Sequence, residues 1–246
     1  MTLRLLSYNI RFGGVGREAP LCAVIRKAEP DVVVFQEANR PAVIEQLARE
    51  TGMTTWGASP KHSVGFMSRM EMKTREWRLP RGSSRSLLEL EPAGSGIKIF
   101  GIHLSAIHSN WTEGRRTREL RAVLSDIASH REGLHLLTGD FNTLAPGEKL
   151  DLRQLPRRLR VLSWVLGGKI RWRTVQILLD AGYVDGYRKL HPEAGFTFPT
   201  WRPHIRLDYV FLPGSSAERL SQCEVLTGPE AVAASDHFPL LAVLDV

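Results

Sequence analysis

Gly139-Asp140-Phe141-Asn142 is the stretch from which the fold and the chemistry of this chain can be worked out. It follows residues 134–138, an apolar run typical of a buried strand. Asp140 and Asn142 lie two positions apart, so both side chains share one face of an extended segment. Asp140 would orient a water or protonate a leaving group, and Asn142 would hydrogen-bond charge developing on a phosphoryl oxygen. The alternative is an Asx-type turn that caps the next segment of the chain.

The second informative stretch is Ser235-Asp236-His237-Phe238, which precedes an apolar run at residues 240–246. Asp208 lies upstream in residues 207–212, which predict another strand. A buried Asp needs a strong partner, and a His is a common one. We therefore expect Asp208 to orient and charge His237, which would face a phosphate, while Asp236 faces a metal. His103, at the end of a strand predicted at residues 97–104, is a further candidate, although a single His there is more often a core residue.

Two N-terminal segments complete the pattern. Residues 3–10 predict a strand that ends near Asn9, and residues 31–35 form a β-branched run that leads into Gln36 and Glu37. A carboxylate at the end of a buried strand costs free energy unless a positive charge compensates it. A hard divalent cation such as Mg²⁺ does so with one or two carboxylates and several waters. The four segments together point to metal-assisted hydrolysis of a phosphoester.

Alternating strand and helix signals favour one α/β domain over residues 1–246. Helices are expected at residues 20–28, 41–50, 115–130 and 172–181, from apolar spacing and from proline and glycine near their ends. Further strands are expected at residues 64–68 and 86–90. The chain is 43% hydrophobic and 24% charged, as is usual for globular proteins.

Neither a signal peptide nor a spanning segment is recognisable. No apolar run approaches the roughly 20 residues that a spanning helix needs, and residues 3–7 lead directly into the candidate site segment around Asn9. We therefore expect a cytoplasmic protein, with peripheral membrane contact as an open alternative. Cys22 and Cys223 are expected to be buried thiols, and a disulfide is the alternative.

The net charge of +7 comes from one segment. Residues 151–173 contain seven of the 33 Lys and Arg and one of the 26 Asp and Glu, so the rest is nearly neutral. Four leucines share one face of a helix predicted there: Leu155, Leu159, Leu162 and Leu166. This basic amphipathic insertion would pack its leucines on the body, contact an anionic membrane surface or lipid, or contact a nucleic-acid backbone.

In seven ordered segments the chain resembles the endonuclease/exonuclease/phosphatase superfamily, which includes DNase I-like nucleases, abasic-site endonucleases, neutral sphingomyelinases and inositol polyphosphate 5-phosphatases. The segments are Ser-Tyr-Asn9-Ile, Phe-Gln-Glu37, Val64-Gly65-Phe66-Met67-Ser68-Arg69, Ile102-His103-Leu104, Thr-Gly-Asp140-Phe-Asn142, Leu207-Asp208-Tyr209-Val210-Phe211 and Ser-Asp236-His237-Phe-Pro. The resemblance implies a four-layer α/β sandwich, in which two mixed sheets lie face to face with helices on both outer sides. The chain departs from the family pattern at residues 151–173.

The same resemblance implies a metal and a phosphate-binding histidine. Mg²⁺ or Mn²⁺ would lie at Glu37, assisted by Asn9 and Asp236. His237 would pair with Asp208 and contact the scissile phosphate.

The resemblance also implies roles for the remaining polar groups. Asp140 would position the attacking water or assist the leaving group, and Asn142 and His103 would bind phosphoryl oxygens.

The substrate class stays open between two possibilities. A lipid or small-molecule phosphoester suits the basic amphipathic segment, whereas a DNA strand suits a groove whose basic and aromatic side chains contact phosphates and bases. The candidates for that groove are Arg115, Arg116, Arg118, Trp111, Trp201 and Arg202. A third possibility, a non-catalytic scaffold, is disfavoured because the acid, amide and histidine set is intact.

Overall fold

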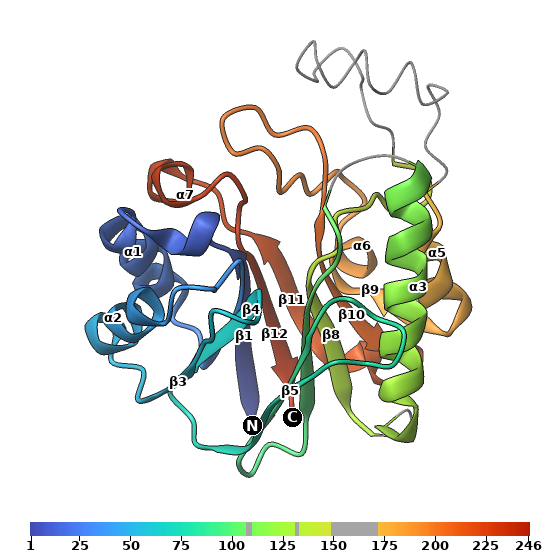
Figure 1. Cartoon of the computed structure of the whole chain (residues 1–246), viewed down its shortest axis with the longest axis horizontal. Helices are drawn as coiled ribbons and strands as arrows, with labels where there is room; N and C mark the ends of the chain where they lie inside the picture. The colour runs from blue at the N-terminus through green and yellow to red at the C-terminus, as the bar shows by residue number, and fades with distance from the viewer. Residues whose placement is uncertain (107–109, 131–132, 149–171) are drawn as a thin grey trace.

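Two six-stranded β-sheets form the centre of the protein (Figure 1). The computed structural model describes residues 1–106, 110–130, 133–148 and 172–246. The strands of the first sheet are, in spatial order, β11 (Leu220–Val225), β12 (Leu240–Asp245), β1 (Thr2–Asn9), β2 (Val32–Gln36), β4 (Val64–Ser68) and β3 (Thr55–Gly57). Those of the second are β5 (Met72–Arg78), β6 (Leu87–Pro92), β7 (Lys98–His103), β8 (His135–Asp140), β10 (Asp208–Pro213) and β9 (Tyr183–Asp185). Both sheets are mixed, because β1 runs parallel to β2 and β7 parallel to β8 among antiparallel neighbours.

Apolar side chains of both sheets meet in the space between them. Leu5 and Val34 of the first sheet belong to one buried cluster with Leu90 and Val210 of the second. All five residues of β2 are buried, as expected for a strand covered on both faces. Each fully buried side chain of this size contributes about 1.5–3 kcal/mol. This shared core holds the two sheets face to face.

Helices cover the outer face of each sheet (Figure 1). The first sheet carries α1 (Glu18–Ala28), α2 (Pro41–Thr51) and α7 (Pro229–Ala234), and the second carries α3 (Asn110–Asp126) and α5 (Thr174–Asp180). A short α6 (Gly186–Leu190) contacts β10 and β11. The described residues also contain the 3₁₀ turns η1 (Phe12–Gly14), η2 (Ala128–His130) and η4 (Gly214–Arg219). The four layers confirm the predicted α/β sandwich.

The register of the second sheet places three polar residues side by side. Asp140 at the end of β8 is opposite His103 of β7 on one side and Asp208 of β10 on the other. Gly139, directly before, has a φ of 140°, and a Cβ there would overlap the carbonyl oxygen of Ile102. Glycine at this position therefore lets β8 approach β7 closely just where the polar row forms.

The sequence predicted the central elements better than the outer ones. The prediction of residues 64–68 coincides with β4, and the other predicted strands agree with the structure to within one or two residues at each end. No pattern predicted β3, β5, β9, β11, α6 or α7, which are short or lie at sheet edges. The helix predicted at residues 115–130 begins earlier, at Asn110, and its last turn is the separate η2.

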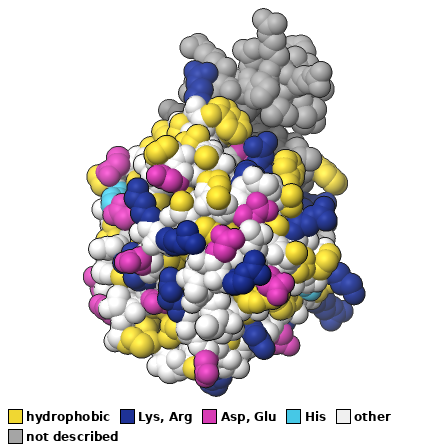
Figure 2. All heavy atoms as spheres, turned by 90° about the vertical axis from the view of Figure 1, so that its left-hand side faces the viewer, with side chains coloured by type: hydrophobic (Ala, Val, Ile, Leu, Met, Phe, Trp, Pro, Cys, Tyr) yellow, Lys and Arg dark blue, Asp and Glu magenta, His cyan; other side chains and the backbone are white. Residues whose placement is uncertain are grey.

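Charge is distributed evenly over the face that carries α1 and α2. Figure 2 shows Lys and Arg side chains interspersed with Asp and Glu there, as expected once the basic segment is set aside. Most of that segment lies outside the described residues, so the predicted amphipathic insertion at residues 151–173 stays a prediction. Within the described part of the chain, no helix combines the length and apolar character needed to cross a membrane.

Candidate active site

Asn9 and Glu37 come from the first sheet, at the ends of two parallel neighbouring strands. The Nδ2 of Asn9 donates a 3.0 Å hydrogen bond to Oδ2 of Asp140 and lies 3.5 Å from Oε1 of Glu37. Glu37 has a left-handed φ of 59°, and its Oε2 accepts a 2.6 Å hydrogen bond from the amide of Phe12. A single buried amide thus links one carboxylate from each sheet.

Asp140 and Asn142 follow β8 of the second sheet. The amide of Asn142 donates a 2.8 Å hydrogen bond to Oδ1 of Asp140, so the alternative of an Asx-type turn is realised. Its side-chain Nδ2 donates to the carbonyl of Leu104 at 3.1 Å, which engages one of its two protons. The turn holds Oδ2 of Asp140 toward Asn9 and the imidazoles. Turn formation and a catalytic position are therefore compatible.

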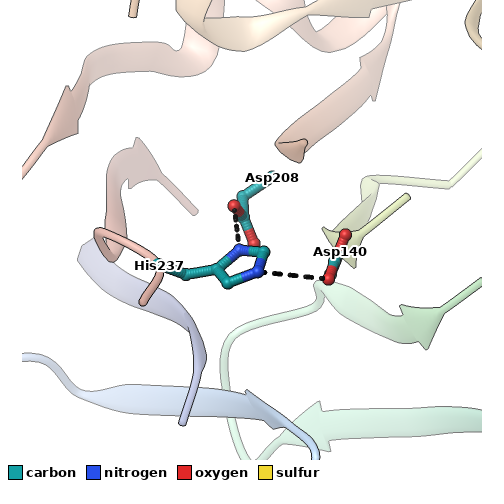
Figure 3. A group of neighbouring side chains, drawn as sticks. All are labelled: Asp140, Asp208 and His237. Carbon is teal, nitrogen blue, oxygen red and sulfur yellow. Dashed lines mark hydrogen bonds and ion pairs between the residues drawn. The ribbon is translucent and has the colours of Figure 1, made fainter. Parts of the chain in front are cut away.

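The predicted pair of His237 and Asp208 is present (Figure 3). Nδ1 of His237 lies 2.9 Å from Oδ2 of Asp208, and both residues are buried. Nε2 of the same ring lies 3.9 Å from Oδ2 of Asp140. The ring of Phe198 packs against the imidazole with its centroid 4.8 Å away. The imidazole therefore lies between two carboxylates, as Figure 3 shows, and is supported by an aromatic ring.

Two buried carboxylates around one imidazole set the protonation states. Burial alone would lower the pKa of His237, but the charges of Asp208 and Asp140 outweigh it and raise that pKa to about 10. Burial raises the pKa of Asp140 to about 7, although the nearby His237 charge opposes the shift. His237 is thus an imidazolium at neutral pH, and Asp140 is a carboxyl group that exchanges a proton near neutrality.

His103 lies on the other side of Asp140, with Nε2 3.8 Å from its Oδ2. Burial lowers the pKa of His103 to about 3, and the charge of Arg85 adds to the shift, so this imidazole is neutral. Its buried Nδ1 has no hydrogen-bond partner among the described residues. By contrast, His135 is a hydrogen-bonded core histidine whose Nε2 lies 2.7 Å from the Tyr183 hydroxyl. An unpartnered ring nitrogen favours a functional over a core role for His103.

Asp236 reaches the site from the loop before β12. Its Oδ2 lies 3.3 Å from Nε of Arg11, a contact that no sequence pattern predicted. The hydroxyl of Ser235 donates to the carbonyl of Asn9 at 2.7 Å, and the hydroxyl of Thr200 donates to the carbonyl of Ser235 at 2.8 Å. The first hydrogen bond fixes the loop to the end of β1 and the second fixes it to the segment around Thr200, so Asp236 lies at the edge where Asn9 ends its strand.

Buried acids and a histidine form a group that could bind a metal ion. Among the described residues, the potential ligand atoms of Asp140, Asp208 and His237 all lie within 4.8 Å of one another. The imidazolium of His237 is not a ligand in this state, because a metal-bound ring must be deprotonated. With Glu37 and Asp236 the edge has four carboxyl groups, near the imidazolium of His237 and the guanidiniums of Arg11 and Arg17. Carboxyl oxygens are the ligand type that a hard cation such as Mg²⁺ or Mn²⁺ prefers.

Two of the predicted substrate residues, Trp201 and Arg202, lie on the loop whose Phe198 packs against His237. Trp201 is 65% exposed, and its ring centroid lies 6.3 Å from that of Phe198, which packs on His237. Arg202 is exposed directly after it. Both are accessible to a substrate that projects from the site.

The predicted basic cluster of α3 divides into accessible and buried residues. Arg115 is partly exposed and pairs with Glu119 at 3.1 Å. Arg116 is fully buried, and its Nε bonds Oε2 of Glu113 at 3.0 Å. The expectation that Arg116 lines a groove is therefore wrong, because a buried charge needs the carboxylate partner that Glu113 supplies.

Arg206, which no sequence pattern singled out, supports the start of β10. Its buried guanidinium makes two hydrogen bonds to Asp185, at 2.8 and 2.6 Å, and lies 4.5 Å above the ring of Tyr209. It precedes Asp208 by two residues, so it fixes the backbone from which that carboxylate projects. The signal in the sequence was a charged residue directly before a buried strand.

The chain as a whole has relatives among known proteins. A model of the Endonuclease/Exonuclease/phosphatase family matches residues 6–237. The chain belongs to this family. Membership confirms the expected class of enzyme, a metal-dependent phosphoric ester hydrolase. Comparison with curated protein sequences found no match.

Solved structures with the same fold cover the whole chain. An AP endonuclease from Archaeoglobus fulgidus is 20% identical with a TM-score of 0.73, over 99% of this chain and 100% of that chain. The 3′ phosphatase NExo from Neisseria, bound to a product DNA hairpin, is 18% identical with a TM-score of 0.69, over 99% and 100%. D. rerio TDP2, complexed with a single-strand DNA product, is 18% identical with a TM-score of 0.68, over 100% and 99%. This family member therefore shares the complete fold of these proteins.

Proposed function

We propose that the chain hydrolyses a phosphoester with a water molecule as nucleophile and Mg²⁺ or Mn²⁺ as cofactor. The observation that carries the proposal is the row of His103, Asp140 and Asp208, with His237 held between the two carboxylates. It combines a positively charged imidazolium, a carboxyl group whose pKa is raised by burial and a neutral imidazole within one small volume.

Glu37 and Asp236 would hold the metal ion, with Asn9 beside them. Their oxygen atoms are the ligand type that Mg²⁺ and Mn²⁺ prefer. Bound there, the ion would neutralise charge on a phosphoryl oxygen and polarise the phosphorus. Asn9 would keep Glu37 and Asp140 in position, because its side-chain amide nitrogen contacts both carboxyl groups.

His237 would bind a non-bridging phosphate oxygen through Nε2, while Asp208 on Nδ1 keeps the ring charged and oriented. The negative charge on the phosphoryl oxygens grows toward the transition state, so a fixed imidazolium stabilises that state most. Asp140 would accept a proton from the attacking water, because its pKa of about 7 suits transfer at neutral pH. Asn142 and His103 would each donate an N–H to a phosphoryl oxygen.

Nucleic acid is the substrate class best supported by the comparisons. The two neighbours from Neisseria and D. rerio are bound to DNA products, and this chain shares their whole fold. On that basis Trp201 and Arg202, on the loop that packs against the histidine, and Arg115 on α3 would contact the strand around the scissile phosphate. Contact with a lipid or a membrane surface would depend on the basic insertion and remains a prediction, as does a cytoplasmic location.

The test is hydrolysis of bis-p-nitrophenyl phosphate and of DNA by the purified protein with Mg²⁺ or Mn²⁺. We expect turnover that EDTA abolishes and that re-added metal restores. His237→Ala and Asp140→Asn should reduce kcat by about a thousandfold or more with an unchanged circular dichroism spectrum. His135→Asn is the matched control, because His135 is a buried histidine outside the site. Wild-type rates in the two site variants would overturn the proposed site.

A further inference from the structure

Two adjoining hollows run along the loop between β5 and β6. The first has a volume of about 220 Å³ and is lined on its basic side by Lys61 and Arg85. The second has a volume of about 260 Å³ and is lined by Trp111 and Arg118 at the start of α3. Ser84 lines both hollows, so they lie next to each other, and we call the pair the Ser84 groove.

The Ser84 groove begins at the catalytic edge. Asn39 lines its first hollow, and the amide of Asn39 bonds the carbonyl of Glu37 at 2.9 Å. From the same hollow, the charge of Arg85 reaches the buried imidazole of His103 and contributes to the lowered pKa of that ring. A substrate whose scissile phosphate lies among Glu37, Asp140 and His237 can therefore extend into the groove.

The cations of the first hollow lack carboxylate partners. Nε of Arg85 is buried and has no hydrogen-bond partner among the described residues. No described carboxylate forms an ion pair with this guanidinium, although its charge reaches Glu119 and lowers the pKa of that carboxyl group. By contrast, the guanidinium of Arg78 pairs with Glu89 at 2.8 Å and with Asp126 at 2.9 Å. Partial burial of an unpaired guanidinium costs free energy, which a bound phosphate would offset with paired hydrogen bonds.

The acid beside the second hollow is already satisfied. Glu119 accepts hydrogen bonds from the hydroxyl of Ser84 at 2.7 Å, from the amide and hydroxyl of Ser105 at 3.0 and 2.7 Å, and from Arg115 at 3.1 Å. Its charge is therefore committed within the protein. Arg118 donates only to the carbonyl of Gly114, at 3.3 Å, among the described residues, so the groove keeps a net positive charge.

An exposed aromatic ring stands at the far end of the groove. Trp111 is 71% exposed, although it lies on the first turn of α3 and its neighbours Thr112 and Glu113 are buried. Trp77, which also lies near the first hollow, is instead stacked on His62 at 5.6 Å and bonds the carbonyl of Val64. A free indole face beside a cationic hollow suits a planar, electron-rich ring attached to a phosphate.

We propose that the Ser84 groove binds a single-stranded stretch of nucleic acid next to the scissile phosphate. A neighbouring phosphate would bind Lys61 and Arg85, and a base would stack on Trp111 beside Arg118. The inference rests on the proposed function, because it places the scissile phosphate in the catalytic site. A lipid headgroup or an inositol polyphosphate would use the cations but has no planar base for Trp111, so a nucleotide chain fits both features.

The first test measures binding without catalysis. A short fluorescein-labelled single-stranded oligodeoxynucleotide is titrated by fluorescence anisotropy in a His237→Ala background. Arg85→Gln and Trp111→Ala should each raise Kd roughly tenfold. Arg85→Gln should also lower the slope of log Kd against log salt by about 0.7, the value for one phosphate contact on a single strand. Arg121→Gln, an exposed arginine of α3 outside the groove, is the matched control and should stay within about twofold of the parent.

The second test compares substrates. The ratio of kcat/KM for the oligonucleotide to that for bis-p-nitrophenyl phosphate, which has no flanking phosphate, should fall roughly tenfold in Arg85→Gln and in Trp111→Ala. Unchanged Kd values and an unchanged ratio would overturn the groove assignment. The nucleic-acid assignment would be overturned by a different result: Arg85→Gln raises the Kd for inositol hexakisphosphate as much as the Kd for the oligonucleotide, and Trp111→Ala changes neither Kd. If no ester is cleaved while Arg85→Gln and Trp111→Ala still weaken oligonucleotide binding, the hydrolytic function fails and the groove stands.

Discussion

Replacing Asp208 by Asn keeps the size of the side chain and removes the charge that holds His237 as an imidazolium. The pKa of His237 is about 10 against an ordinary value of 6.5, which corresponds to about 5 kcal/mol in favour of the charged ring. Burial opposes the charge on the ring, so the nearby carboxylates supply all of this favourable free energy. Asp208 is the one hydrogen-bonded to the ring, at 2.9 Å, and we assign it at least half, about 2–3 kcal/mol.

A loss of this size lowers the pKa of the ring by about 1.5–2 units, to about 8, so kcat should fall little at pH 7 and about tenfold at pH 9. The imidazole of the variant is then charged over a narrower pH range, because it loses its proton as the pH rises through the lowered pKa. The activity of the variant should therefore decline as the pH rises through about 8, whereas His237 of the wild type stays protonated up to about pH 10. KM should change less than kcat, since the charge acts chiefly on the transition state.

The assay is kcat and KM for bis-p-nitrophenyl phosphate from about pH 5 to 9 with saturating metal, together with the His237 ring pKa from ¹⁵N NMR shifts. Asp245→Asn, the same exchange at an exposed position at the end of β12, is the control. A variant with wild-type kcat and an unshifted ring pKa would refute the reasoning. A lowered ring pKa with full activity would show that the imidazolium is not what stabilises the transition state.

Three further changes have defined expectations. Glu37→Gln should weaken Mn²⁺ binding by about tenfold or more in isothermal titration calorimetry, and unchanged affinity would exclude Glu37 as a ligand. Gly139→Ala, at φ 140° against the Ile102 carbonyl, should lower the free energy of unfolding by about 3 kcal/mol or more in urea titrations, and a fully stable variant would contradict that geometry. Glu113→Gln should cost about 3 kcal/mol at pH 7 by removing the carboxylate charge that neutralises the buried guanidinium of Arg116. Burial would raise the pKa of Glu113, but the charge of Arg116 and hydrogen bonds from backbone amides hold it below its ordinary value of 4.5. The stabilisation by ionised Glu113 is therefore fully present above pH 4.5 and is lost as the pH falls through the lower pKa of the folded state. The difference in free energy of unfolding between the wild type and Glu113→Gln should therefore disappear at acidic pH. A difference that does not change with pH would contradict the pairing.

The central strands were predictable because local sequence is enough to specify them. β2 and β8 are short runs of β-branched and apolar residues covered on both faces, and such runs have few alternatives. The edge strand β5 was missed because its outward side chains are charged and its apolar positions are few. Its existence depends on pairing with β6, a long-range interaction that no local pattern reveals.

The candidate residues could be found from the sequence because each follows or lies in a strand signal. Their mutual geometry could not. How the two sheets meet decides whether the Asp140 carboxyl group contacts Asn9, His237 or only the backbone of its own turn. In the structure it contacts all three. Arg116 shows the opposite limit, because an arginine on an amphipathic helix looks accessible until its buried partner Glu113 is known.

The sequence by itself determined the family, the layered fold and the set of acid, amide and histidine side chains, because these depend on residue identity and on short-range periodicity. Only the tertiary structure decided the protonation states of His237, Asp140 and His103 and which cations remain free to bind substrate. The protonation states and the free cations both depend on burial and on side chains that come from distant segments of the chain. Asp208 meets His237 at the catalytic edge, and Arg85 and Trp111 line neighbouring parts of the groove. Electrostatic energies at such distances are set by the folded environment and cannot be read from neighbours in the chain.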